Sequence, residues 1–130
     1  MSAATTSKPK SGASSVRNDP PRPQIRIMFR KAIAMGPGKA DLLRAIEQTG
    51  SISAAARALG MSYRRAWLLV DTMNRCFREP LVASATGGTG GGGAQVTDFG
   101  RRVLARFRAM QARVDRALDP ELTRFAELLK

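Results

Sequence analysis

Residues 51–70 read Ser51-Ile-Ser-Ala-Ala-Ala-Arg-Ala-Leu-Gly60-Met-Ser-Tyr-Arg-Arg-Ala-Trp-Leu-Leu-Val70, a pattern that predicts two helices joined by a tight turn. Ala55 and Ala56 are small enough to let two helices cross closely, and Leu59 is placed to fill the junction. Gly60 can adopt the positive φ that such a turn needs. We therefore predict a helix-turn-helix over this stretch.

The helix caps fall where this arrangement needs them. Ser51 or Ser53 can cap the first helix, and Ser62 can cap the second. The second helix should run to about Arg78, since Pro80 closes the stretch.

The second helix has one apolar side and one polar side. Its predicted buried stripe consists of Ala66, Leu69 or Val70, Met73 and Phe77. The start of the helix and its opposite side carry the residues that we predict to contact DNA, which are Ser62, Tyr63, Arg64, Arg65, Trp67, Leu68, Thr72 and Arg75.

The roles of these residues follow from their chemistry. A DNA-reading helix places its N-terminal residues against base edges, where an arginine can make paired hydrogen bonds to guanine. Tyr63 and Arg64 are therefore the predicted base contacts, whereas Arg65 and Arg75 suit phosphates equally well. Trp67 is either a contact or part of the core. The alternative to a DNA-binding helix-turn-helix is that the two predicted helices form an ordinary amphipathic pair with solvated arginines.

Two short strand candidates, residues 81–84 and 94–97, follow the helix pair and enclose a glycine-rich loop. A hairpin after a helix-turn-helix is a wing, whose backbone N–H groups can approach phosphates where side chains are absent. A flexible linker is the alternative, whereas a nucleotide-binding glycine motif would need a helix directly after the loop. The predicted DNA contacts of the loop are Thr86, Gly87, Gly88, Thr89 and Gly90.

A long helix is predicted from Asp98 to Leu118, with a stop and restart at Asp119-Pro120 before a short terminal helix. A winged domain of this size needs only part of such a helix for its core. The surplus predicts a homodimer, since two-fold dimers match two-fold DNA sites, although the helix can also pack on its own domain. The predicted dimerisation residues are Val103, Phe107, Met110, Val114 and Leu118.

On the N-terminal side, Ile25, Ile27 and Phe29 alternate with Arg26, Met28 and Arg30, a pattern that predicts a half-buried strand. A helix is expected over residues 39–48. The chain therefore divides into a disordered basic tail (1–23), a winged helix-turn-helix domain (24–97) and a C-terminal dimerisation helix with its short terminal helix (98–130). The fold class is mainly α with a small β-hairpin.

The composition of the chain limits the classes of function that it can have. The chain of 130 residues has 22 Lys and Arg against 10 Asp and Glu, a formal charge of +12 that attracts polyanions. It has no histidine and one cysteine, Cys76, so we expect no enzyme, no metal site and no cofactor. No apolar run approaches the roughly 20 residues of a membrane span, and a single cysteine suits a reducing compartment. We expect a cytoplasmic protein.

Several motifs are similar to the N-terminal DNA-binding domain of the ModE family of molybdate-responsive regulators, a LysR-like winged group. They are Gly50-Ser-Ile-Ser53, Gly60-Met-Ser-Tyr63, Ala66-Trp67, Met73-Asn74, Leu81-Val82, Ala85-Thr-Gly-Gly88, Gly90-Gly-Gly-Gly93 and Thr97. The resemblance covers about residues 24–118.

The resemblance implies a winged fold, dimerisation through the long helix, and DNA contacts at Ser62, Tyr63, Arg64, Trp67 and the loop 86–93. Thr89 stands where family members often carry a basic residue, which predicts a weaker wing. The family's C-terminal oxyanion-binding domain has no counterpart in the 130 residues, so no molybdate site is expected.

The leading hypothesis is a sequence-specific transcription regulator that binds double-stranded DNA as a homodimer. A nonspecific or architectural DNA-binding protein is the first alternative, because the charge alone supports it. A protein-interaction adaptor is the second.

Overall fold

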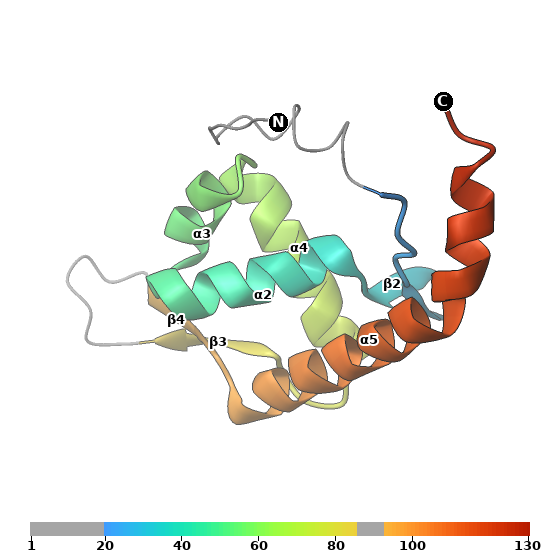
Figure 1. Cartoon of the computed structure of the whole chain (residues 1–130). Helices are drawn as coiled ribbons and strands as arrows, with labels where there is room; N and C mark the ends of the chain where they lie inside the picture. The colour runs from blue at the N-terminus through green and yellow to red at the C-terminus, as the bar shows by residue number, and fades with distance from the viewer. Residues whose placement is uncertain (1–19, 86–92) are drawn as a thin grey trace. The chain divides into compact units, whose positions relative to one another are not determined.

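The computed structural model describes residues 20–85 and 93–130, and it is mainly helical with small antiparallel hairpins (Figure 1). Among the described residues, contacts divide the chain into two compact units, one of residues 24–114 and one that holds residues 20–23 and 115–130. The elements in chain order are β1 (Ile27–Phe29), β2 (Ala32–Met35), α2 (Pro37–Thr49), α3 (Ile52–Ala58), α4 (Tyr63–Cys76), β3 (Val82–Ala85), β4 (Gly93–Val96) and α5 (Asp98–Ala126).

The N-terminal strand forms where expected, but its burial and its partner differ from the prediction. β1 pairs with β2 in an antiparallel hairpin, with Phe29 opposite Ala32, and Arg30 adopts a φ of 57° in the turn between them. All of β1 is exposed, so the prediction of a half-buried strand was wrong. β2 was not predicted. It carries the burial instead, through Ala34 and Met35.

α2 is confirmed and slightly longer than predicted. Leu42, Leu43 and Ile46 are fully buried on its inner side. Gly50 ends the helix in the left-handed region, with a φ of 80°, a conformation that costs glycine little. Ser51 then caps α3 by accepting a hydrogen bond from the Ala54 N–H at 2.9 Å, which decides between the two serines considered as caps.

The turn between α3 and α4 contains the predicted left-handed glycine, since Gly60 has a φ of 70°. Ala55 and Ala56 are buried at the crossing, and Met61 packs partly against the core. Leu59 is exposed, so the prediction that it fills the junction was wrong. The two alanines bring the helices close enough that no larger side chain is needed there.

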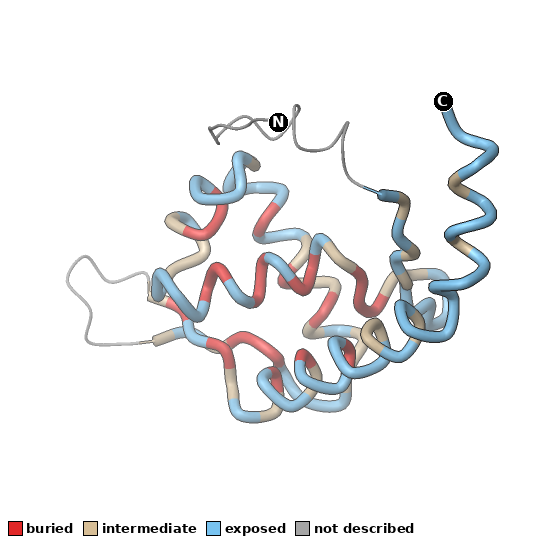
Figure 2. Tube along the Cα trace, in the orientation of Figure 1, coloured by how far each residue is buried: buried red, intermediate tan, exposed pale blue. Residues whose placement is uncertain are grey.

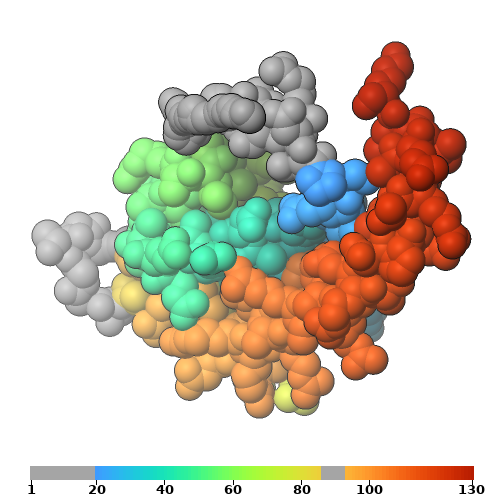
Figure 3. All heavy atoms as spheres, in the orientation of Figure 1, coloured from blue at the N-terminus to red at the C-terminus, as the bar shows by residue number. Residues whose placement is uncertain are grey.

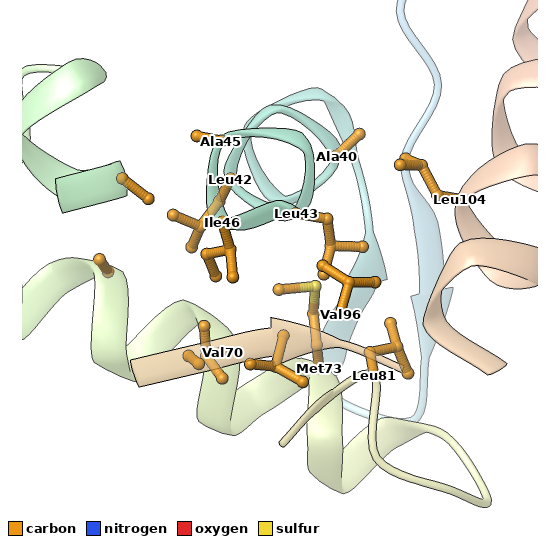
Figure 4. Close-up of a cluster of buried hydrophobic side chains, with 14 of the residues drawn as sticks. Ala40, Leu42, Leu43, Ala45, Ile46, Val70, Met73, Leu81, Val96 and Leu104 are labelled. Carbon is orange, nitrogen blue, oxygen red and sulfur yellow. The ribbon is translucent and has the colours of Figure 1, made fainter. Parts of the chain in front are cut away.

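The core lies where α2, α4, the wing hairpin and α5 meet. In Figure 4, Leu43 and Ile46 of α2, Met73 of α4 and Val96 of β4 point toward one another. Figure 2 shows that the buried segments concentrate in these elements, whereas the last part of α5 is mostly exposed. The core therefore fixes α4 by one side only and leaves its other side in solvent.

α5 continues to Ala126 without a break, so the predicted stop at Asp119-Pro120 was wrong. Pro120 lacks an N–H and removes one helical hydrogen bond, but water can solvate the freed carbonyl because this part of the helix is exposed. The Thr123 hydroxyl donates to the Asp119 carbonyl at 3.1 Å.

Candidate nucleic-acid interface

α4 begins with a satisfied cap. The Ser62 hydroxyl accepts a hydrogen bond from the Arg65 N–H at 3.1 Å, as predicted, and the helix runs to Cys76 rather than Arg78. Ser62 is thus placed at the start of α4, where its hydroxyl is already occupied as an acceptor but its hydrogen remains free for a further acceptor.

The predicted contact residues lie on the side of α4 that faces solvent. Tyr63 is 55% exposed, Trp67 46% and Leu68 44%. Arg64 and Arg65 are also exposed. Trp67 is therefore only partly packed. Its exposed part is available to a ligand, and its contact with DNA stays a prediction. Figure 3 shows the face made by α2 and the first part of α5; α4 runs behind α2 in this orientation (Figure 1).

Two predicted contacts on α4 already have partners within the chain. The Thr72 hydroxyl donates to the Leu68 carbonyl at 3.0 Å. Arg75 forms an ion pair with Asp71, one turn earlier on the helix, at 2.7 Å. The Arg75 side chain is 76% exposed and that of Asp71 28%. Solvent at the guanidinium keeps the contribution of this pair to stability small, so the pair orients the guanidinium more than it holds the fold.

The side chain of Asn74 ties α4 to the wing hairpin. Its amide oxygen accepts from the Leu81 N–H at 2.8 Å and the Val82 N–H at 3.3 Å, and its amide nitrogen donates to the Val82 carbonyl at 3.1 Å. This role was missed. The available signal was an asparagine inside a helix that ends just before a strand, since asparagine satisfies backbone groups outside regular ladders.

The wing strands pair in register, with Val82 opposite Val96 and Ala85 opposite Gly93. The strands confirm the predicted hairpin, displaced by one residue. The predicted contacts at the wing tip lie outside the described residues; they are Thr86, Gly87, Gly88, Thr89 and Gly90.

α5 is fastened to the base of the wing. The Thr97 hydroxyl donates to the Pro80 carbonyl at 2.8 Å and accepts from the Gly100 N–H at 2.9 Å. A Cβ on Gly100 would overlap the Leu81 carbonyl oxygen. The helix therefore packs directly on the backbone of the hairpin, and it holds the wing in place relative to α4.

Several arginines in or near α5 make contacts within the chain. Arg101 pairs with Glu47 of α2 at 2.9 Å and with Asp98 at 3.2 Å. The guanidinium carbons of Arg78 and Arg102 lie 5.4 and 5.5 Å from the centroid of the Phe99 ring, within cation–π range. These side chains are less available to DNA than those of α4.

The predicted dimerisation residues do not share one environment. Phe107 is 5% exposed and belongs to the core of its own unit, so it is not available to a second copy. Val103 packs partly on that core. Met110 is 42% exposed, and Leu118 is also exposed.

Among residues 20–85 and 93–130, no helix combines the length and apolar character of a membrane span. Within the same part of the chain, no three acidic or cysteine side chains gather as a metal site would require.

Comparison with known families identifies this arrangement. Residues 39–101 match the family described as bacterial regulatory helix-turn-helix protein, lysR family. These residues form a LysR-type helix-turn-helix domain. The match begins in α2 and ends in the first turn of α5, so the LysR-type domain contains the helix pair, the wing and the contacts that fasten α5 to it.

Curated relatives share this region. The molybdenum transport protein ModE of Azotobacter vinelandii is 46% identical over 86 residues, which are 66% of this chain and 32% of that protein. The molybdenum-pterin-binding protein MopB of Rhodobacter capsulatus is 44% identical over 72% of this chain and 34% of its own length. The DNA-binding transcriptional dual regulator ModE of Escherichia coli K12 is 34% identical over 73% of this chain and 36% of its own length.

The chain spans about a third of the length of these curated relatives, and it is similar to the N-terminal helix-turn-helix part of ModE regulators. Among solved structures, VV2_1132, a LysR family transcriptional regulator, aligns with a TM-score of 0.52 at 15% identity, over 72% of this chain and 30% of that one. This likeness supports the winged fold alone.

Proposed function

We propose that the chain is a sequence-specific DNA-binding transcription regulator, with α4 in the major groove and the β3–β4 hairpin as its wing. The observation that carries the proposal is the exposed side of α4. There Tyr63, Arg64 and Leu68 face solvent at the start of a helix whose other side is fully used by the core. An α-helix in this position matches the width of the major groove.

The rigid attachment of the wing supports the proposal. Asn74 links α4 to the hairpin, and Thr97 links the hairpin to α5. A helix and a wing that move as one body can contact a groove and its flanking backbone at a fixed spacing. The relatives named as transcriptional regulators add support, because their similarity lies in this same part of the chain.

The proposal includes a homodimer through α5. Met110 is exposed on this helix, next to an apolar groove of about 510 Å³ that is lined by Ile27, Met35, Phe77 and Phe99, among others. A second copy is the occupant that suits it, since a dimer would place two α4 helices for a two-fold DNA site. Arg78, Arg102 and Arg106 also line this groove.

The proposed function is tested by selecting bound fragments from genomic DNA and footprinting them. We expect a short protected site with two related halves. Arg64→Ala should weaken binding to that site by about 1–3 kcal/mol, roughly five- to 150-fold, and relax its sequence preference. Arg44→Ala is the matched control, because Arg44 is an exposed arginine of α2, and we expect no change in its preference.

Two results would contradict the proposal. Equal affinity for every duplex would favour the nonspecific DNA-binding alternative, which the net charge of +12 supports. Unchanged binding by the Arg64→Ala variant would remove α4 from the interface.

A further inference from the structure

The apolar groove beside α5 is lined by three parts of the chain, which are the β1–β2 hairpin, the C-terminal end of α4 and the first half of α5. All of its lining residues belong to the unit 24–114. Its volume of about 510 Å³ is within the range of small-molecule sites in proteins. The groove is therefore large enough for a small organic ligand.

The inner surface of this groove is apolar and partly aromatic. Met35 is 1% exposed and Phe107 5%, whereas Met110 remains 42% exposed. The Phe77 and Phe99 rings meet edge to face, with 6.5 Å between their centroids. A ligand with an apolar body would remove these side chains from water, which favours its binding.

Three arginines, Arg78, Arg102 and Arg106, also line the groove. The guanidinium carbons of Arg78 and Arg102 lie 5.4 and 5.5 Å from the centroid of the Phe99 ring, so two charges are placed directly beside the apolar surface. Among residues 20–85 and 93–130, Arg102 and Arg106 form no ion pair, and Arg78 approaches only Glu79, at 3.9 Å. Positive charge in the groove is thus available to a ligand.

This combination of charge and apolar surface specifies the chemistry of the ligand. A purely apolar occupant would cover guanidinium groups without pairing them, which costs free energy. A small inorganic anion would leave the apolar surface in water. A carboxylate on an apolar body satisfies both requirements, because a guanidinium can pair with a carboxylate through two parallel hydrogen bonds.

We propose that the groove binds a small organic carboxylate with an apolar body, and that the bound acid opposes self-association of the chain. The second part rests on the proposed function, because the homodimer proposed above uses Met110 and this same groove. The groove cannot hold the acid and a second copy at once. A ligand that binds only the copy with a free groove shifts the equilibrium toward the monomer, which would weaken binding to a DNA site with two halves.

The first test titrates the full chain with 2-naphthoate, an aromatic acid, and with decanoate, an aliphatic one, by isothermal titration calorimetry. We expect one bound molecule per chain and a dissociation constant on the order of 0.1–1 mM, as for a ligand with about a dozen non-hydrogen atoms. The tighter acid identifies the apolar body as aromatic or aliphatic. Acetate has the charge alone and 2-naphthylmethanol the apolar body alone, and each should bind about tenfold more weakly or less well still.

Arg106→Met tests the role of the groove charge, because it removes the guanidinium and keeps a long side chain. We expect it to weaken binding of either acid by about tenfold. Arg108→Met is the matched control, since Arg108 is an exposed arginine of the same helix outside the groove, and it should bind the acids as the wild type does. Both replaced residues are exposed, so circular dichroism should show an unchanged fold. Equal losses in the two variants would overturn the site, because they would reflect attraction to the net charge alone.

The second test measures self-association by sedimentation velocity with and without the tighter acid. At ten times its dissociation constant, the acid should weaken association of the wild type and of Arg108→Met by about tenfold or more, the factor by which it stabilises each free copy. Its effect on Arg106→Met should be clearly smaller.

The remaining outcomes separate this inference from the proposed function. No binding of either acid would overturn the site. Binding that depends on Arg106 but leaves association unchanged would overturn the competition with a second copy. A wild type that is monomeric at every concentration would contradict the proposed dimer, whereas binding that depends on Arg106 would still support the site for the acid.

Discussion

α4 and the second half of α5 are both amphipathic helices, but they present opposite sides to solvent. In α4 the apolar stripe of Ala66, Val70 and Met73 is buried, and the exposed side carries arginines together with Trp67 and Leu68. In α5, Leu104 and Phe107 join the core, whereas Met110, Leu118 and Phe125 are exposed and Val114 is half-buried.

The difference separates two kinds of surface. An exposed basic side on a rigidly packed helix suits a polyanion, because its charges are held at fixed positions without loss of apolar burial. An exposed apolar side on a helix that extends past its own core suits another protein surface. The same period of apolar residues thus predicts two different partners, and only the location of the core tells them apart.

The largest effect is expected when α4 is detached from the wing. Asn74→Ala removes three hydrogen bonds and leaves the N–H groups of Leu81 and Val82 without their acceptor. We expect a loss of about 3 kcal/mol in the free energy of unfolding, measured by denaturant titration. Asn74→Asp keeps the acceptor and should lose less. Equal losses in the two variants would contradict this role.

Gly100→Ala tests whether the start of α5 belongs to the DNA-binding unit. The new Cβ would overlap the Leu81 carbonyl and approach Val96 Cγ1 at 2.9 Å. We expect a loss of about 2 kcal/mol in unfolding free energy, as for an overpacked core. Gly38→Ala is the control, since a Cβ there meets nothing within 4 Å. A neutral Gly100→Ala would show that α5 can move away from the hairpin.

Met110→Glu tests the exposed apolar surface of α5. A charge placed in the proposed dimer interface should weaken self-association by about tenfold or more, roughly 1.4 kcal/mol, measured by sedimentation velocity over a range of concentrations. Ala105→Glu introduces the same charge at another exposed position of α5 and should leave association unchanged. A wild type that is monomeric at every concentration would contradict the dimer.

The smallest effect is expected for the ion pair on α4. Asp71→Ala frees Arg75, whose side chain is 2.7 Å from the Asp71 carboxylate. Because the Arg75 side chain is 76% exposed and solvent screens its charge, the unfolding free energy should change by about 0.5 kcal/mol or less. A larger loss would mean that this side of α4 contributes to the fold as well as to binding.

Local signals in the sequence were sufficient for much of the fold. The Ser62 cap, the left-handed Gly60 and the C-terminal end of α2 depend on residues next to them in the chain, and each was predicted, whereas α2 begins two residues earlier than expected. The wing strands followed from their position after the helix pair. For the site, the exposure of Tyr63 and Arg64 followed from helical spacing.

The remaining features depend on contacts between distant segments. The exposure of Leu59 and the burial of Phe107 depend on where other helices pass, which spacing alone does not specify. Asn74 and Gly100 lie in helices but contact the backbone at Leu81, beside the wing hairpin. The helical pattern around each residue does not predict that contact. The predicted helix stop at Pro120 was wrong, because an exposed helix can tolerate one lost hydrogen bond.

The proposed function depends on recognition of the base sequence of a DNA duplex by the exposed side of α4. The most direct measurement is the ratio of affinities for a selected site and a scrambled duplex, in the wild type and in Arg64→Ala, at one salt concentration. We expect a ratio on the order of a thousand or more for the wild type and a clearly smaller one for the variant. An equal ratio in both proteins would contradict the account.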